Sequence, residues 1–257
     1  MTSVTAACAS PMATGMGASW PRPARQRGAV LLILLTLIGL GAATLLINAM
    51  GNNQLQAIRE RRTMATLAQA REAVIGYATL HGRLPRPAAS ATDGLEMAAP
   101  CTTEESCSGF LPWVALGIEG SDSWGKRLRY AVTPVFTREP VDAGRAVATK
   151  VVRGRDSNGK FFYLAGQETC SLRFECLPFV VLSAGKENFG TSDQGIALPN
   201  HSDSNDDEGA NDKAVTVFVS RPFSSDPDIE GGEFDDLVVW ATWNNLMRRM
   251  KAAGRLP

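Results

Sequence analysis

The chain has 257 residues, enough for one or two ordinary domains, and its 26 basic side chains balance 26 acidic ones. This balance excludes the strong positive field that is typical of nucleic-acid-binding proteins. The apolar fraction of 44% is ordinary for a chain that buries a core.

The N-terminal segment combines a basic leader with a long apolar run. Residues 1–28 are rich in Ala, Ser, Thr, Gly and Pro, contain no acidic residue, and are not expected to fold. Residues 29–50 carry no charge, and about 20 apolar residues suffice to cross a bilayer as a helix. The arginines at 22, 25 and 27 predict that the leader is cytoplasmic and that the chain crosses the membrane once.

Two other interpretations of this segment are weaker. A secretory signal peptide has a shorter apolar core, followed by an A-x-A-like cleavage site, which this chain lacks. An ordinary membrane-anchored protein is the second alternative.

The helix is expected to continue beyond the apolar run. Residues 51–80 contain no Pro and are rich in helix formers, and Gly82 and Pro85 favour an end there. An apolar stripe recurs at three- and four-residue steps, at Leu67, Ala70, Val74 and Ala78. A juxtamembrane coiled coil is the alternative, but the stripe is too short for sustained heptads.

The remainder of the chain reads as a head with an antiparallel sheet. Strands are expected at residues 128–135, 161–165, 179–182, 215–219 and 237–240, separated by Gly, Asp, Asn and Pro clusters. A polar insertion occupies residues 185–232, and a short helix capped by Thr242 is expected at 243–253. The predicted fold is α+β, with the long N-terminal helix, transmembrane in its first half, packed on this sheet.

Four short sequence blocks together carry a family resemblance. Arg27-Gly28 directly abuts the apolar run, as at a prepilin cleavage site. Asp122-Ser123-Trp124-Gly125 with Tyr130 is similar to the D-x-W-G-x-x-x-x-Y signature of pseudopilins. Residues 179–187 and the acidic, Trp-ended block at 232–240 are similar to two later blocks of these heads. The blocks occur in family order, and together they resemble type IV pilins and type II secretion pseudopilins.

The resemblance implies a pilin-like organisation and a structural role. Prepilin peptidase would remove the leader, residues 1–28, by cutting after Gly28, and would methylate the new N-terminus at Ala29. Residues 29–50 and 51–82 would form the transmembrane and amphipathic halves of the first helix, and residues 83–257 a periplasmic head. The implied partners are other pilin or pseudopilin subunits, the inner membrane and its assembly platform.

Two departures from the family favour a minor or tip subunit. Most pilins have a Glu at the fifth position after cleavage, where this chain has Ile33. The insertion at 185–232 also makes the head larger than usual. The alternative function is a periplasmic binding module on a single-pass anchor. The sequence does not discriminate a type IV pilus from a secretion pseudopilus.

Cysteine usage agrees with an oxidising compartment. Cys8 lies in the leader, and the other four form two identical spacings, Cys101 to Cys107 and Cys170 to Cys176. Local disulfides are the simplest pairing because each closes a small loop, while cross-pairing stays open. A zinc site is less favoured, since structural sites use shorter Cys spacings and often include His.

No enzymatic motif is present: the chain lacks a G-x-S-x-G elbow, an H-E-x-x-H pair and a P-loop. Asp235 and Asp236 would point to opposite faces of a regular strand, so they do not form an obvious acid–base pair. The chain is therefore not expected to be an enzyme, and an anchored hydrolase is the least favoured class.

Calcium is the one cofactor that the resemblance suggests. Several pseudopilin heads bind one Ca²⁺ in the loop that ends in the acidic block, which implies Asp235 and Asp236 as ligands. Hard Ca²⁺ takes six to eight oxygens from carboxylates, carbonyls and water. A charged turn before a strand is the alternative. The second acidic run, residues 202–209, is interpreted as a solvated loop.

Overall fold

The protein was analysed as a computed structural model that describes residues 27–172 and 176–256, with side chains described in these ranges except at 27–30 and 44–53. The predicted leader thus lies almost wholly outside the described residues. The chain divides into two compact units, Met1–Asn52 and Asn53–Pro257.

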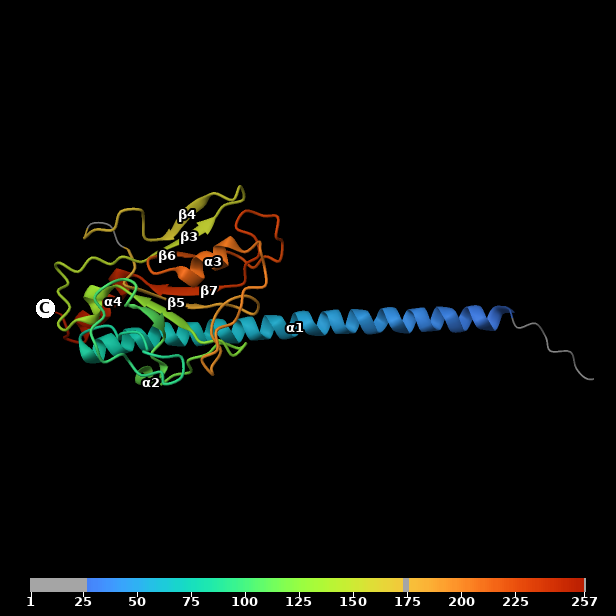
Figure 1. The fold of residues 1–257 in the computed structure, drawn as a ribbon, viewed down its shortest axis with the longest axis horizontal. Coiled ribbons are helices and arrows are strands. Elements are labelled where there is room, and N and C mark those ends of the chain that lie inside the picture. Colours follow the sequence, from blue (N-terminus) through green and yellow to red (C-terminus); the bar gives the residue numbers. More distant parts are fainter. Residues whose placement is uncertain (1–26, 173–175, 257) are drawn as a thin grey trace, which may run out of the picture. The chain divides into compact units, whose positions relative to one another are not determined.

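The first helix, α1, runs from Arg27 to His81 (Figure 1). It ends where Gly82 takes a φ of 68°, a left-handed conformation that favours glycine. In the first unit its described side chains, residues 31–43, are all exposed. In the second unit the predicted stripe is fully buried, at Leu67, Ala70, Val74 and Ala78. Burial of this stripe ties the later part of α1 to the head.

The predicted membrane span at residues 29–50 requires correction. Across the described residues, the structure contains no helix with the length and apolarity needed to cross a bilayer. The predicted fold with a transmembrane first half is therefore wrong in this respect.

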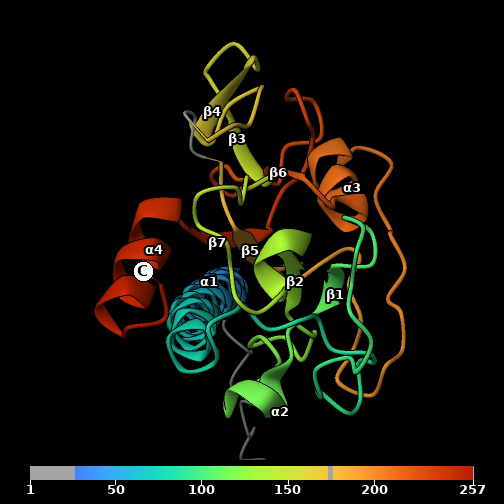
Figure 2. The same cartoon turned by 90° about the vertical axis from the view of Figure 1, so that its left-hand side faces the viewer.

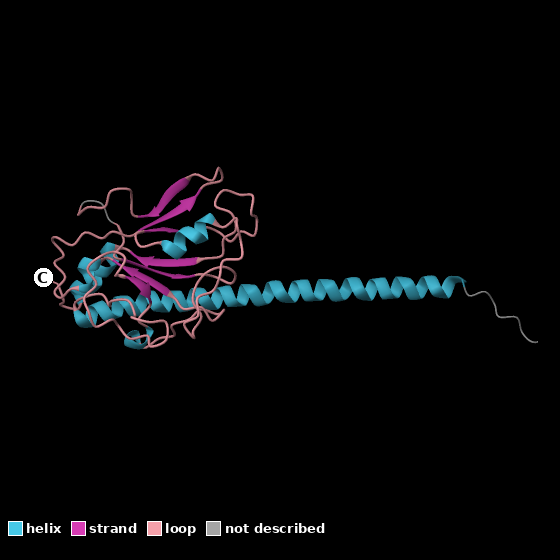
Figure 3. Cartoon of the chain, in the orientation of Figure 1, coloured by secondary structure: helices cyan, strands magenta, loops and turns pink. Residues whose placement is uncertain are grey.

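The second unit is α+β, and its main sheet is antiparallel with the strand order β1-β2-β5-β7 (Figure 3). The four strands span Ser108–Phe110, Arg129–Val132, Phe179–Ser183 and Leu237–Ala241. Tyr130 is paired with Val181, and Val181 with Val239, so these side chains share one face. Three of the predicted strands correspond to β2, β5 and β7.

A second, smaller sheet packs against one face of the main sheet, and its strand order is β4-β3-β6. Its strands span Phe161–Ala165 (β4), Val151–Arg155 (β3) and Val217–Val219 (β6). The β3–β4 pair is antiparallel, whereas β3 and β6 are parallel, which the hairpin-like spacing did not predict.

The two faces of the main sheet bury two different clusters. Tyr130, Phe179 and Val181 pack with the α1 stripe and with α4, Trp243–Ala252. The alternate residues Ala131, Val180, Leu182 and Val238 pack with Val152 and Phe218 of the smaller sheet. The second unit is therefore layered, with α1 and α4 on one face of the main sheet and the smaller sheet on the other (Figure 2).

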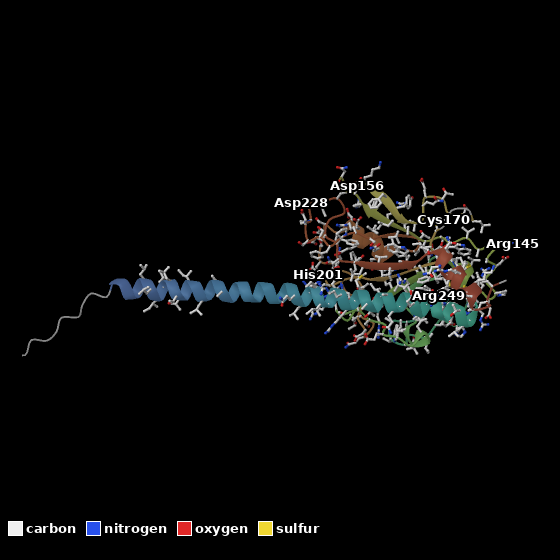
Figure 4. All side chains as sticks on the ribbon, turned by 180° about the vertical axis from the view of Figure 1, so that it is seen from behind. Arg145, Asp156, Cys170, His201, Asp228 and Arg249 are labelled. Carbon is white, nitrogen blue, oxygen red and sulfur yellow. A yellow bond between two sulfur atoms is a disulfide. The ribbon has the colours of Figure 1, made fainter. Side chains whose placement is uncertain are left out.

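Polar contacts fix the helices against the head. Thr63 of α1 is fully buried, and its hydroxyl accepts a hydrogen bond from the Ser123 amide at 3.1 Å. Arg249 of α4 donates to Glu72 of α1 at 2.7 Å (Figure 4). Thr242 caps α4 as predicted, accepting from the Asn245 amide at 3.3 Å.

The remaining elements are short. Helix α2 spans Trp113–Leu116, a 3₁₀ turn spans Pro134–Thr137, and α3 spans Asp206–Lys213. Both local disulfides are present, Cys101–Cys107 and Cys170–Cys176, with Cα atoms 5.2 and 5.6 Å apart. The cross-paired alternative is thus excluded.

Candidate functional site

Three carboxylates from separate parts of the second unit converge beside the end of β5. Glu208 comes from α3, while Asp235 and Asp236 precede β7. One oxygen from each lies within 4.8 Å of the others. We call these three residues the acidic cluster. In a regular strand, adjacent aspartates would point to opposite faces of the sheet. Asp235 and Asp236 lie just before β7 begins, so both can contribute an oxygen to the acidic cluster.

Lys126 supplies a buried cation next to the acidic cluster. Its side chain is only 2% exposed, and its ammonium donates to three carbonyl oxygens in the loop after β5. These are the carbonyls of Ala184 at 2.9 Å, Glu187 at 3.1 Å and Asn188 at 2.9 Å. We call this set of acceptors the carbonyl cradle. Burial lowers the pKa of Lys126, while nearby carboxylates, Asp235 first among them, act to raise it.

Asp122 of the D-x-W-G block positions Lys126. Its Oδ1 accepts hydrogen bonds from the amides of Trp124 and Lys126, both at 2.9 Å. Its Oδ2 accepts from the Ser183 hydroxyl at 2.6 Å. Burial raises the pKa of Asp122, and these hydrogen bonds oppose the shift. The block thus forms a turn that joins β5 to the lysine, and this is a structural role for Asp122.

Asp235 has one satisfied oxygen and one that lacks a partner. Oδ2 accepts hydrogen bonds from the amides of Lys186 at 2.7 Å and Glu187 at 3.0 Å. Oδ1 is buried and has no hydrogen-bond partner in the described part of the chain. Burial and the nearby Glu208 carboxylate raise the pKa of Asp235 to about 6. A buried, unpartnered carboxylate oxygen is costly unless a proton or a cation compensates it.

Asp236 is held more completely. Its Oδ2 accepts from the Asn211 side-chain amide at 2.8 Å, and Asn211 also binds both backbone groups of Val219, at 2.9 and 2.7 Å. Burial raises the pKa of Asp236 well above its ordinary value, and the bond from Asn211 opposes this.

A small cavity of about 110 Å³ opens beside the two aspartates. Gln56 and Glu60 of α1, Trp124 and Leu237 also line it. The indole nitrogen of Trp124 is a second buried group without a hydrogen-bond partner in the described part of the chain. The cavity has room for water or a hydrated ion, and it offers both a donor and an acceptor.

The acidic cluster fits calcium only in part. Asp235 Oδ1 is an available ligand, but both oxygens of Glu208 accept hydrogen bonds, from the Asp235 amide at 2.7 Å and the Asn205 side chain at 2.9 Å. The loop carbonyls that a Ca²⁺ shell would use already accept from Lys126. Calcium binding at Asp235 and Asp236 stays a prediction.

Glu208 was missed because its segment carries no apolar pattern. The run at 202–209 was interpreted as a solvated loop, but α3 begins within it, and Asp207 and Glu208 are buried. Asp207 accepts from Arg155 and Arg221, both at 2.8 Å. A hydropathy pattern does not reveal a buried polar residue whose burial cost is offset by hydrogen bonds and ion pairs. The cue that was available is the concentration of acids and amides at helical spacing.

The other predicted site residues lie apart from the acidic cluster. Cys101 and Cys107 belong to the core between α1 and the main sheet, and Cys176 to the same core. Gly28 and Ala29 fall where α1 has begun, but their side chains are not described, so the predicted cleavage is untested.

No family model, curated protein or solved structure matches the chain. The resemblance to pilins and pseudopilins therefore depends on the sequence blocks alone.

Proposed function

We propose that the chain is a minor or tip subunit of a pilin-like filament, either a type IV pilus or a type II secretion pseudopilus. In this proposal the head is periplasmic and the subunit is made with a leader that prepilin peptidase removes. The proposal rests on one structural observation together with the sequence blocks.

The supporting observation is the contrast along α1. Large apolar side chains between Leu31 and Leu40 are 54–65% exposed, whereas the stripe from Leu67 to Ala78 is fully buried in the head. An exposed apolar surface of this kind needs a partner. Equivalent helices of neighbouring subunits are the partner that the resemblance implies.

Two further features agree with a filament role. The two disulfides suit an oxidising compartment such as the periplasm. Ile33 lies among the exposed apolar side chains and carries no charge that a subunit above it would have to pair. A subunit without that charge suits the tip of a filament.

A paired substitution tests the filament role. Leu37→Ser replaces a side chain that is 63% exposed, and it should exclude the subunit from sheared filaments without lowering the Tm of the head. Thr36→Ser is the matched control, because it keeps the hydroxyl that donates to the Ile33 carbonyl at 2.8 Å. If the Leu37→Ser subunit still enters filaments at the normal level, the proposed contact is wrong.

Mass spectrometry of the mature N-terminus separates a filament subunit from an anchored binding module. Cleavage after Gly28 leaves 257 − 28 = 229 residues, and the expected N-terminus is methylated Ala29. An intact leader, or cleavage elsewhere without methylation, would contradict the proposal. Within it, Ile33→Glu should move the subunit from the tip toward the shaft, and even labelling of native filaments would argue against the tip.

A further inference from the structure

Strand β4 forms an open edge of the smaller sheet. Among the described residues it pairs only with β3, so one row of its backbone groups has no strand partner. The strand, Phe161–Ala165, contains no charged residue and no Pro. Charges, Pro and bulges are the usual means by which proteins prevent another strand from adding to such an edge. The strand itself lacks charges and Pro, and its one irregularity lies toward its C-terminal end, where the register shift between Val152 and Arg153 leaves Leu164 as an extra residue.

The side chains of β4 are exposed on both faces of the hairpin. Phe161, Phe162, Tyr163 and Leu164 are 36–45% exposed, an unusual run of apolar side chains for a strand. The β3–β4 hairpin projects from the rest of the head, with Asp156 of its turn near the outer end (Figures 2 and 4). The main hydrophobic clusters include none of these four residues, so they are not explained by core packing.

The hairpin is shaped to hold these side chains flat. A Cβ at Gly154 of β3 would lie 3.0 Å from the Phe162 ring and 3.3 Å from Leu164, so the glycine lets both side chains lie close across β3 on that face. On the other face, the guanidinium of Arg155 lies 3.8 Å from the Phe161 ring centroid, and that of Arg153 lies 5.0 Å from the Tyr163 ring centroid. The exposed surface is thus ordered, and little entropy would be lost on binding.

The charges around β4 are unbalanced. Arg155 is paired with Asp207 at 2.8 Å. Arg153 instead donates to the Tyr163 hydroxyl at 3.0 Å, and its Nε is buried without a hydrogen-bond partner. In the described ranges neither Arg153 nor Lys160 has a carboxylate within 4.0 Å. Two cations near β4 therefore have no counterion among the described residues: Arg153, on the central strand β3 with its guanidinium over the Tyr163 ring, and Lys160, directly before β4.

We propose that the free edge of β4 is a docking site for an extended segment of another protein that carries carboxylate side chains. The segment would add to the sheet order β4-β3-β6 as a fourth strand, and its backbone would pair with that of β4. Its carboxylates would reach Arg153 and Lys160, and its apolar side chains would cover the aromatic faces. A glycan would also stack on exposed rings, but it would leave the strand edge unpaired.

Designed peptides test this site directly on the full chain. The probes are a short capped peptide that alternates glutamate and valine, and its counterpart with lysine in place of glutamate. The glutamate peptide should bind with a Kd below about 1 mM, and the lysine peptide at least about tenfold more weakly. Hydrogen exchange of the amides in residues 161–165 should slow when the glutamate peptide is bound, because a new strand protects them.

Variants then identify the cation. Arg153→Gln should weaken binding of the glutamate peptide about tenfold, and Arg153→Lys should restore most of it, since the charge returns. Ile196→Ser, which alters a side chain that is 60% exposed outside the hairpin, is the matched control and should bind normally. A thermal melt of each variant checks that the head remains folded.

Several results would overturn the proposal. Equal binding of the two peptides, absence of binding, or protection outside residues 161–165 would each contradict it. Binding of a soluble oligosaccharide at Tyr163 without any binding of the glutamate peptide would assign the surface to a glycan instead.

Discussion

Replacing Lys126 with methionine should destabilise the head strongly, because its buried ammonium donates hydrogen bonds to all three carbonyls of the carbonyl cradle. Methionine is similar in length, so the change removes the charge and the three donated hydrogen bonds while largely preserving volume. The carbonyls of Ala184 and Asn188 belong to buried residues and would be left without a donor, whereas Glu187 is exposed and water replaces its bond.

The expected cost follows from these two buried acceptors and the lost charge. Each buried acceptor that loses its partner costs about 1–3 kcal/mol. Removing one partner from a buried set of charges costs about 3–5 kcal/mol in total, and we expect Lys126→Met to fall in this range. For a unit of 257 − 52 = 205 residues this corresponds to a fall in Tm of roughly 10 °C.

The assay is denaturant unfolding of the full chain, followed by tryptophan fluorescence. Lys186→Met is the matched control: Lys186 lies in the same loop, is half exposed, and in the described ranges its ammonium pairs only with Glu187, so its loss should cost close to zero. The cost of Lys126→Met should also shrink at pH 5, because the Asp235 carboxyl, with a pKa of about 6, then carries a proton. A loss below about 1 kcal/mol at pH 7.5 would refute this account.

Three further predictions concern pH, backbone strain and calcium. Burial acts to raise the pKa of Glu96, but hydrogen bonds, that from Arg83 first, outweigh this effect and lower the pKa to about 2. The ionised carboxylate therefore stabilises the folded head fully above about pH 4.5, and this contribution is lost as the pH falls toward 2. Glu96→Gln should abolish this acid-dependent part of the unfolding curve. Gly185→Ala should destabilise the head more than Gly117→Ala: both glycines have positive φ, but a Cβ at Gly185 would meet the Asp235 carboxylate at 2.0 Å, and one at Gly117 meets nothing within 4 Å. Finally, Ca²⁺ should raise the Tm of Lys126→Met more than that of the wild type, because the variant leaves the carbonyl cradle without the ammonium. Melts with chelator serve as the control. Equal shifts in the two proteins would mean that Lys126 does not compete with calcium.

Much of the head was predictable because apolar periodicity marks surfaces that must be buried. The stripe of α1 and the strands β2, β5 and β7 carry this signal. Strand β3 was missed because Gly154 and two arginines follow its two buried valines and interrupt the apolar pattern; these arginines make cation–π contacts with β4. The membrane span was predicted from composition alone, and the described part of α1 does not bear it out.

The candidate site was only half predictable for a different reason. Asp235 and Asp236 were found through a resemblance, whereas Glu208 and Lys126 are buried polar groups, which local patterns do not reveal. Lys126 follows the D-x-W-G block and would ordinarily be placed on the surface. Its burial depends on carbonyls about sixty residues later in the chain, and such pairing exists only once the fold has formed.

The hydrogen bond between Thr63 and Ser123 has a mechanical consequence for the head. Apolar contacts along α1 tolerate sliding, because one leucine or alanine can replace another at a similar depth. A directional hydrogen bond to the fully buried Thr63 hydroxyl does not tolerate sliding. This bond therefore sets the rotation of this part of α1 about the helix axis and its position along that axis. Tension applied along α1 would load this bond and the buried stripe together in shear, rather than detaching the helix turn by turn. The helix and the head would then resist such tension as one body.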